Sequence, residues 1–413
     1  PKAIPFACPP PEETSIAVLP FVNMSADPEN EFFSDGVSEE ILNVLARVPE
    51  LKVAARTSSF SYKGQNEKVS VIAEELGVNH VLEGSVRKVG NQVRVTAQLI
   101  QASDGFHLWS ETYDRELDNI FAIQDDIAQQ IAEAMRVSLV EESQPVSNLT
   151  GTTSLAAYEH YLRGIGLWHE RTAVSLRSAR DAFEAAIAED EEFAKAHSGL
   201  ALTWAIWADY MDSDHRESGA LASQHAERAL RLDPGNFEAH AALGQVAAGD
   251  PDDWEDVVKH YDTAIELNPS FATAYQWYGR FRQFRGDHDS ARALFERALA
   301  LDPRSRIAKT NLAWGFISAG DLAQATRHMN EALEQYPDFP DALSGIVVLA
   351  TVNGTCAEVG MAARKLVRVL RKSNDRADRY VALCEAGSGP EAEAILREML
   401  DWGEFRYADP ESP

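Results

Sequence analysis

The sequence predicts a small α/β domain with a mixed sheet, followed by an all-α superhelical solenoid of repeated helical pairs. Three observations support this fold class. Apolar runs with strand and helix spacing alternate over about the first 140 residues. Strand patterns then disappear after residue 155. Prolines recur in the second part at intervals of 35, 34 and 34 residues, which indicates a repeat.

Composition and charge exclude several classes of function. The chain has 413 residues, of which 45% are hydrophobic and 25% charged, as in ordinary globular proteins. Its 65 acidic residues outnumber the 38 basic ones and give a net charge of −27. Without a broad basic face, this chain is not expected to bind nucleic acid. No apolar run reaches 18 residues, so we expect membrane attachment only through a segment upstream of Pro1.

The amino-terminal residues and the three cysteines carry little functional signal. Residues 1–14 hold five prolines and predict a linker of polyproline character, which contains Cys8. Three scattered cysteines are too few for a zinc cluster or a disulfide framework. Cys356 and Cys384 would pair in an oxidising compartment, but the favoured interpretation is two small buried apolar side chains.

The α/β domain is predicted to span residues 15–142. Its expected elements are strands at 15–21 and 51–56, helices at 30–48 and 69–77, a hairpin at 80–105, a strand at 106–116 and a helix at 120–139. Ser34 or Asp35 is the expected N-cap of the first helix. The adjacent carboxylates Glu39 and Glu40 are expected on the solvated surface, because sequence neighbours on a helix point apart.

The remaining chain is predicted as a linker at 143–154, a solenoid of about six helical pairs at 155–402, and a tail at 403–413. The best repeat matches the tetratricopeptide pattern at Tyr275, Tyr278, Gly279, Gly286, Ala291, Phe295, Ala298 and Pro303. In this pattern the small residue lets two helices approach, the aromatic ring fills the space between repeats, and the proline ends the second helix.

No motif for catalysis, a cofactor or a metal ion is found. The 11 histidines are dispersed, and pairs such as His225 and His240 lack the spacing of two ligands on one helical face. We therefore expect no enzymatic activity, no cofactor and no metal.

The expected functional surface is the concave groove that the first helix of each repeat lines. The candidate partner-binding residues are Thr273, Gln276, Arg280, Gln283, Phe284, Thr310, Trp314 and Ile317. This mixed polar and aromatic lining suits a peptide or a loop of a partner protein. It lacks the Lys and Asn set with which chaperone co-factors clamp an acidic C-terminal tail. Packing between repeats explains Trp314 equally well.

The amino-terminal domain resembles a known family. The phrases AVLPF, FSDGVSEEI, VAARTSSF, LEGSVR, VRVTAQLI and LWSETYDR follow the order of the TolB-like amino-terminal domain of bacterial proteins. The matching positions, expected mostly to serve the fold, include Phe32, Asp35, Gly36, Glu40, Arg56, Gly84, Ser85, Arg87, Trp109 and Tyr113. The resemblance implies that tetratricopeptide (TPR) repeats follow the domain. It also implies that both form the C-terminal region of a CadC-type membrane transcriptional regulator or a class III adenylate cyclase.

These observations predict a non-catalytic interaction and sensing module of a bacterial signal-transduction protein, with a winged-helix or adenylate cyclase effector upstream. Its expected partner is a protein or peptide in the TPR groove. Its expected location is the periplasmic side of the inner membrane if the parent protein spans it, and the cytoplasm otherwise. The alternative is a periplasmic or cytoplasmic assembly scaffold that binds partner proteins through the same groove. The oligomeric state is not predicted.

Overall fold

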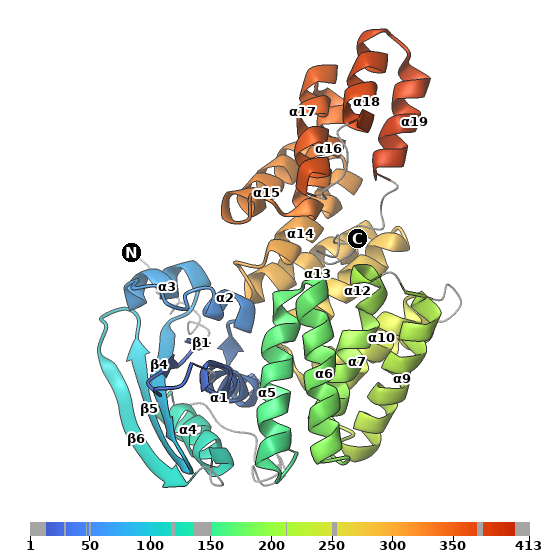
Figure 1. Ribbon diagram of the computed structural model, residues 1–413. Helices are drawn as coiled ribbons and strands as arrows, with labels where there is room; N and C mark the ends of the chain where they lie inside the picture. Colours follow the sequence, from blue (N-terminus) through green and yellow to red (C-terminus); the bar gives the residue numbers. More distant parts are fainter. Residues whose placement is uncertain are drawn as a thin grey trace, which may run out of the picture. The chain divides into compact units, whose positions relative to one another are not determined.

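A computed structural model describes residues 14–28, 30–46, 48, 51–116, 120–135, 151–211, 213–249, 254–369 and 375–400 (Figure 1). Nearly all of the predicted linker 1–14, with Cys8, lies outside the described residues, as do residues 143–150 of the second linker and the tail 403–413. The chain divides into two compact units, Pro1–Thr150 and Gly151–Pro413, and each is described by itself.

The first unit is a mixed six-stranded sheet with helices, which confirms the predicted α/β class. Its strands are β1 Ser15–Val18, β2 Val22–Asn23, β3 Lys52–Val53, β4 His80–Val89, β5 Gln92–Gln101 and β6 His107–Glu116. Its helices are α1 Asn30–Leu45, α2 Arg56–Phe60, α3 Val69–Leu76 and α4 Ile120–Ala134. The strand order is β3-β1-β4-β5-β6, and β2 also pairs with β4.

The sheet combines two kinds of pairing. Strands β3, β1 and β4 are parallel, as is β2 with β4, whereas β4, β5 and β6 run antiparallel. Ala17 and Val81 pack against Ile72 and Leu76 of α3 on one face. Because side chains alternate along a strand, the buried Ile16 faces the other side of the sheet. Helix α1 contacts β1, β2 and β4, and α4 contacts β5 and β6.

Three sequence predictions in this unit are wrong in detail. Helix α1 begins at Asn30, so Ser34 and Asp35 lie inside the helix and are not its N-cap. The predicted strand 15–21 shortens to β1, which ends at Val18 before Pro20, a residue with no N–H to donate to a sheet, and the short strand β2 follows at Val22. The predicted strand 51–56 shortens to β3, because the chain turns into the short helix α2 at Arg56.

The paired carboxylates of α1 also contradict the expectation of a solvated surface. Glu39 and Glu40 are only 5% and 3% exposed. Nε of Arg56 donates a 2.7 Å hydrogen bond to Oε2 of Glu39, which compensates for burying that charge. The expectation fails because α1 is covered on more than one side, by the sheet and by α4.

The second unit is entirely helical in its described residues. Its helices are α5 Leu155–Glu170, α6 Ala173–Glu189, α7 Ala194–Ala205, α8 Trp207–Tyr210, α9 His215–Leu232, α10 Phe237–Ala247, α11 Trp254–Leu267, α12 Ala272–Phe284, α13 His288–Leu301, α14 Arg306–Ser318, α15 Leu322–Gln335, α16 Pro340–Asn353, α17 Cys356–Val369, α18 Asp375–Glu385 and α19 Gly389–Leu400. They form seven consecutive pairs with the short helix α8 inserted between α7 and α9, where the sequence predicts about six pairs.

Small residues set the spacing of the helices in the central repeats. A Cβ atom on Gly279 of α12 would lie 2.5 Å from Cε1 of Phe295 in α13, closer than real atoms approach. The ring of Phe295 is fully buried and also reaches Gly315 of the next repeat. A single aromatic side chain therefore packs within one repeat and against its neighbour, as the sequence pattern predicts.

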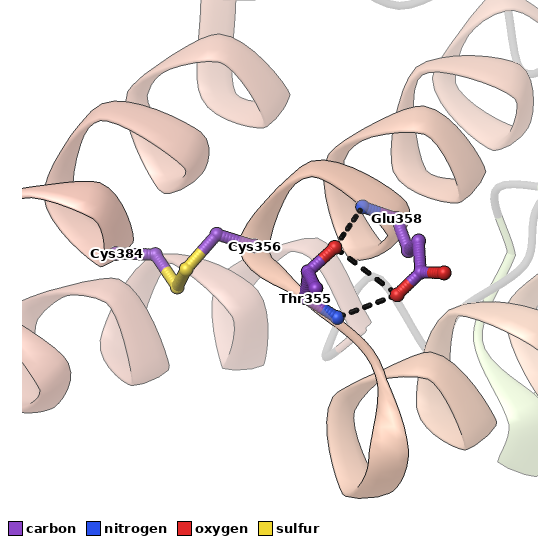
Figure 2. The surroundings of a disulfide bond; sticks show 4 residues. All are labelled: Thr355, Cys356, Glu358 and Cys384. Carbon is purple, nitrogen blue, oxygen red and sulfur yellow. Dashed lines mark hydrogen bonds between the residues drawn. A yellow bond between two sulfur atoms is a disulfide. The ribbon is translucent and has the colours of Figure 1, made fainter.

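The C-terminal pairs have a covalent link. Cys356, the first residue of α17, and Cys384 of α18 form a disulfide (Figure 2). The favoured interpretation of these cysteines as two separate buried side chains is therefore wrong. Beside the disulfide, the backbone N–H of Thr355 donates to Glu358 at 2.6 Å, and the N–H of Glu358 donates to the Thr355 hydroxyl at 3.3 Å. This capping box fixes the start of α17.

Candidate functional site

Arg280 and Phe284 are the most accessible of the eight predicted groove residues. Both belong to α12, the first helix of the best-matching repeat, and lie one helical turn apart. The phenyl ring of Phe284 is 97% exposed, although burial of such a ring is strongly favourable. Arg280 is exposed and makes no hydrogen bond or ion pair with another described residue. Together they present a guanidinium with no hydrogen bond or ion pair to another described residue beside an uncovered aromatic ring.

Polar groove residues connect neighbouring first helices. Nε2 of Gln276 donates to the hydroxyl of Ser305, the N-cap of α14, at 3.4 Å. Nε2 of Gln283 donates to the hydroxyl of Ser318 at 3.1 Å. Gln276 is buried, whereas Gln283 is half-buried and can exchange its bond for one to a ligand. These two amides hold α12 and α14 in register.

The other candidates are less accessible. The buried hydroxyl of Thr310 bonds to carbonyl groups of its own helix, and Thr273 is half-buried. Trp314 and Ile317 pack, half-buried, against the apolar cluster that Met329 and neighbouring residues form. The structure therefore brings Arg280, Gln283 and Phe284 to the surface, and it places Trp314 at least partly between repeats.

Charged residues on neighbouring helices, including Arg280, interact electrostatically. Burial raises the pKa of Asp341, the second residue of α16, whereas the positive charges of Arg280 and Arg306 lower it and Asp209 raises it. The guanidinium of Arg306 also lies 5.0 Å from the ring centre of Tyr336. Helices α12, α14 and α16 thus share one electrostatic environment with the inserted helix α8.

The inserted helix contributes a second group to the same environment. Burial raises the pKa of Tyr210 in α8, and the charges of Arg171, Asp341 and Arg306 also act on it. Neither Asp341 nor Tyr210 is among the sequence-predicted groove residues. Asp341 could have been found by aligning the repeats, because it is the second residue of its helix, the position that Thr273 occupies in α12.

Two histidine pairs were also missed by the sequence prediction. Nδ1 of His197 lies 3.1 Å from Nδ1 of His225, and Nδ1 of His240 lies 3.0 Å from Nδ1 of His260. Each pair joins the two helices of one repeat, α7 with α9 and α10 with α11. His197 and His240 are each the fourth residue of their helix, so aligning the repeats would have revealed the pattern.

The geometry around the first pair fixes its protonation pattern when both rings are neutral. Nε2 of His197 lies 3.2 Å from the carbonyl oxygen of Glu191, so this nitrogen is a donor. Nδ1 of His197 then accepts a hydrogen bond from Nδ1–H of His225. Burial, followed by the neighbouring His197, lowers the pKa of His225 to about 4. The pair therefore holds its hydrogen bond in the neutral form.

In the first unit, two phrases of the TolB-like resemblance come together. Nζ of Lys63 lies 2.6 Å from Asp35 and 2.7 Å from Glu31, next to the Arg56–Glu39 pair. Burial raises the pKa of Asp35, although Lys63 acts against this shift. These ion pairs connect α2 and the following turn to α1, so we assign these residues a role in stabilising the fold.

No group of three or more His, Cys, Asp or Glu side chains that would hold a metal ion occurs among the described residues. Within the same residues, no helix is long and apolar enough to cross a membrane.

Protein-family models match parts of both units of the chain. Residues 252–306 and 285–345 each match a tetratricopeptide repeat family, so the helical unit contains TPR repeats. Residues 12–130 match the second domain of HilA/YgeH-like transcriptional regulators. That match covers most of the predicted α/β domain.

A bacterial relative covers part of the chain. The "Putative adenylate cyclase 3" of Rhizobium meliloti (strain 1021) is 41% identical over 192 residues, which is 46% of this chain. The chain spans about a third (33%) of the length of that relative. Human protein O-mannosyl-transferase TMTC1 is 45% identical over 53 residues, which is 13% of this chain and 6% of the human protein.

The chain is also similar to several solved structures. A thermophilic TPR protein of Thermus thermophilus has a TM-score of 0.39 at 21% identity, and the match covers 48% of this chain and 98% of that protein. The PilF protein of Pseudomonas aeruginosa has a TM-score of 0.40 at 17% identity, and the match covers 53% of this chain and 93% of PilF. The family matches and the fold together describe helical TPR repeats that follow a regulator-like α/β domain.

Proposed function

We propose that this chain is a non-catalytic interaction and sensing module of a bacterial signal-transduction protein. It binds a segment of a partner protein along the first helices of the central TPR repeats. Arg280 and Phe284 carry this proposal, because Arg is among the residue types that dominate protein interfaces and covering an exposed aromatic ring is strongly favourable. Gln283 supplies a hydrogen-bonding group between them.

The signalling context rests on a different observation. The α/β unit resembles the TolB-like domain, and the Rhizobium relative is named as an adenylate cyclase. The HilA/YgeH-like match points to a regulator of transcription. These similarities favour a parent protein with an effector domain upstream over an assembly scaffold that has no signalling output. In this proposal the chain controls that effector through the partner it binds.

The disulfide supports a periplasmic location for the module. Disulfides persist in oxidising compartments and are rare in the cytosol of mesophilic bacteria. Cys356 and Cys384 are bonded at the C-terminal pairs of the solenoid. Thiol labelling of the protein isolated from cells under alkylating conditions tests this point, because a periplasmic protein would leave both cysteines unlabelled.

The partner-binding proposal is tested by affinity purification with substitutions that leave the core intact. Arg280→Glu with Phe284→Ala reverses the charge at one exposed position and removes the ring from the other. The control is Arg297→Glu with Met361→Ala, two exposed residues on the second helices α13 and α17. Quantitative mass spectrometry should show partners that are lost with the first variant and retained with the control. Equal retention by both variants would exclude the α12 surface as the binding site.

A further inference from the structure

The two edges of the sheet in the first unit differ sharply. At one edge, β3 has two residues and β1 four, so few backbone groups are left open to another strand. At the other edge, β6 has ten residues, and no described strand pairs with its outer side (Figure 1). An edge strand of this length exposes a row of N–H and C=O groups that can pair with another chain.

Strand β6 lacks several of the sequence features that keep edge strands from pairing with another chain. Its sequence HLWSETYDRE contains no proline, glycine or lysine. From Trp109 to Glu116 it pairs with β5 residue for residue, and the irregularity of the ladder lies nearer the strand's start, beside Leu99 and Ile100. Trp109, Thr112 and Tyr113 are residue types that favour extended structure. The outer edge is therefore a regular strand from Trp109 to Glu116, which a further strand can join.

The charges along β6 match a second copy of the same strand. In an antiparallel pair centred on Tyr113, Glu111 of each copy lies opposite Arg115 of the other, and Thr112 lies opposite Asp114. Glu111 and Arg115 are exposed and form no ion pair with another described residue. Centring the pair on Glu111 instead would place two carboxylates face to face, which is unfavourable.

We propose that the outer edge of β6 pairs antiparallel with the β6 edge of a second copy of this chain. The register is centred on Tyr113, and two Glu111–Arg115 ion pairs flank the two-fold axis. Each sheet then continues into the other through the two β6 strands. This interface involves no residue of the TPR surface, so a result against it would not affect the proposed partner binding, and the reverse also holds.

Charge reversal tests the interface on the whole chain by sedimentation velocity. The unaltered chain should sediment as a dimer. E111R and R115E should each weaken self-association by roughly tenfold or more, because each variant places like charges opposite each other at two points. A mixture of the two single variants should form a heterodimer, because every pair is then again of opposite sign. The double variant E111R/R115E should also recover the dimer.

The mixture distinguishes a weakened interface from a misfolded chain. A misfolded variant cannot be rescued by mixing, and circular dichroism checks the fold of each chain. Arg87→Glu on the inner strand β4 is the matched control and should remain dimeric. A monomeric unaltered chain at high concentration would overturn the proposal, as would a dimer that neither single variant weakens. A mixture that stays monomeric would overturn the register.

Discussion

Gly84 in the sheet and Gly279 in the solenoid make the same kind of contact with an aromatic ring. A Cβ atom on Gly84 would lie 2.8 Å from Cζ of Phe21, and one on Gly279 would lie 2.5 Å from Cε1 of Phe295. The sheet contact joins residues 63 positions apart, whereas the solenoid contact joins residues 16 positions apart. The first therefore depends on the topology of a whole unit, and the second depends on one repeat and its neighbour.

This difference predicts how far the loss of stability caused by a local substitution extends in each unit. In a solenoid, stability is close to a sum of repeat terms and nearest-neighbour terms, so a local defect is felt mainly by adjacent repeats. In a mixed sheet, parallel strands and their crossover helices fold as one cooperative body. The following experiments test or sharpen this contrast, in order of decreasing expected effect.

Phe295→Ala should have the largest effect and should reveal the local character of the solenoid. Removing a fully buried aromatic ring costs about 3–5 kcal/mol of stability. Hydrogen exchange measured by mass spectrometry should speed up in α12–α15 and progressively less in more distant helices. Phe284→Ala is the matched control, since the same substitution at a 97% exposed position should leave exchange unchanged. Uniform acceleration across all the TPR helices would contradict nearest-neighbour coupling.

Opening the disulfide should destabilise only the C-terminal helical pairs. The bond joins residues 28 positions apart, and closing a loop of this length stabilises a protein by about 3–4 kcal/mol in the chain-entropy description. Cys356→Ser with Cys384→Ser should therefore increase exchange in α17 and α18. The central repeat α12–α13 should keep its protection. Loss of protection there as well would show that the terminal pairs support the whole solenoid.

Gly84→Ala should show the cooperative response of the sheet. The added methyl group would meet the carbonyl oxygen of Thr96 and the ring of Phe21, and such overpacking costs about 1–3 kcal/mol. Exchange should increase together in β1, β4 and β5. Gly389→Ala is the control, because nothing lies within 4 Å of a Cβ atom at that position. An increase confined to β4 would argue against a single cooperative unit.

Acid should weaken the repeats that contain the histidine pairs. The pKa of His225 is lowered to about 4 in the folded chain, from 6.5 when unperturbed, so folding favours the neutral ring. The stabilisation of the fold that comes from keeping His225 neutral is fully present above pH 6.5 and is lost as the pH falls toward 4. Allowing for partial solvent exposure, the loss is about 1–2 kcal/mol.

Denaturant unfolding between pH 7 and pH 4 measures this contribution. The groups around His225 include His197, whose pKa burial also lowers, and Arg228 and Arg231, whose charges act on His197. His225→Gln should flatten the pH dependence of the unfolding free energy. His215→Gln, at an exposed position of the same helix, should leave it unchanged. If His225→Gln left the pH dependence of the unfolding free energy unaltered, the His197–His225 pair would be excluded as the source of that dependence.

Much of the fold follows from patterns that repeat locally. The TPR phase places α12 and α13 correctly because each repeat reuses the same spacing of small, aromatic and proline residues. The hairpin is predicted from two alternating runs around Gly90-Asn91, and in the structure Gly90 adopts a positive φ of 57°, which glycine tolerates in a tight turn. These features depend on residues close together in the sequence.

The features that escaped prediction depend on distant residues. Burial of Glu40 depends on the sheet and α4 that cover α1, and the Arg56–Glu39 pair forms only when the start of α2 comes near α1. The disulfide and the histidine pairs need the crossing geometry of helices that the sequence alone does not provide. The electrostatic influence of Asp341 on Tyr210 arises only when α16 and the inserted helix α8 are brought near each other by the fold. The eight predicted groove residues were chosen by repeat position, and that rule does not distinguish the exposed Phe284 from the buried Thr310.

Photocrosslinking at position 284 tests the central claim most directly. The parent protein would carry p-benzoylphenylalanine in place of Phe284 on α12 or, as a control, in place of the exposed Met361 on α17. Irradiation in cells should give a discrete partner adduct from position 284 that disappears when Arg280→Glu is added. Adducts from position 361 with none from position 284 would contradict partner binding on the first helices of the central repeats.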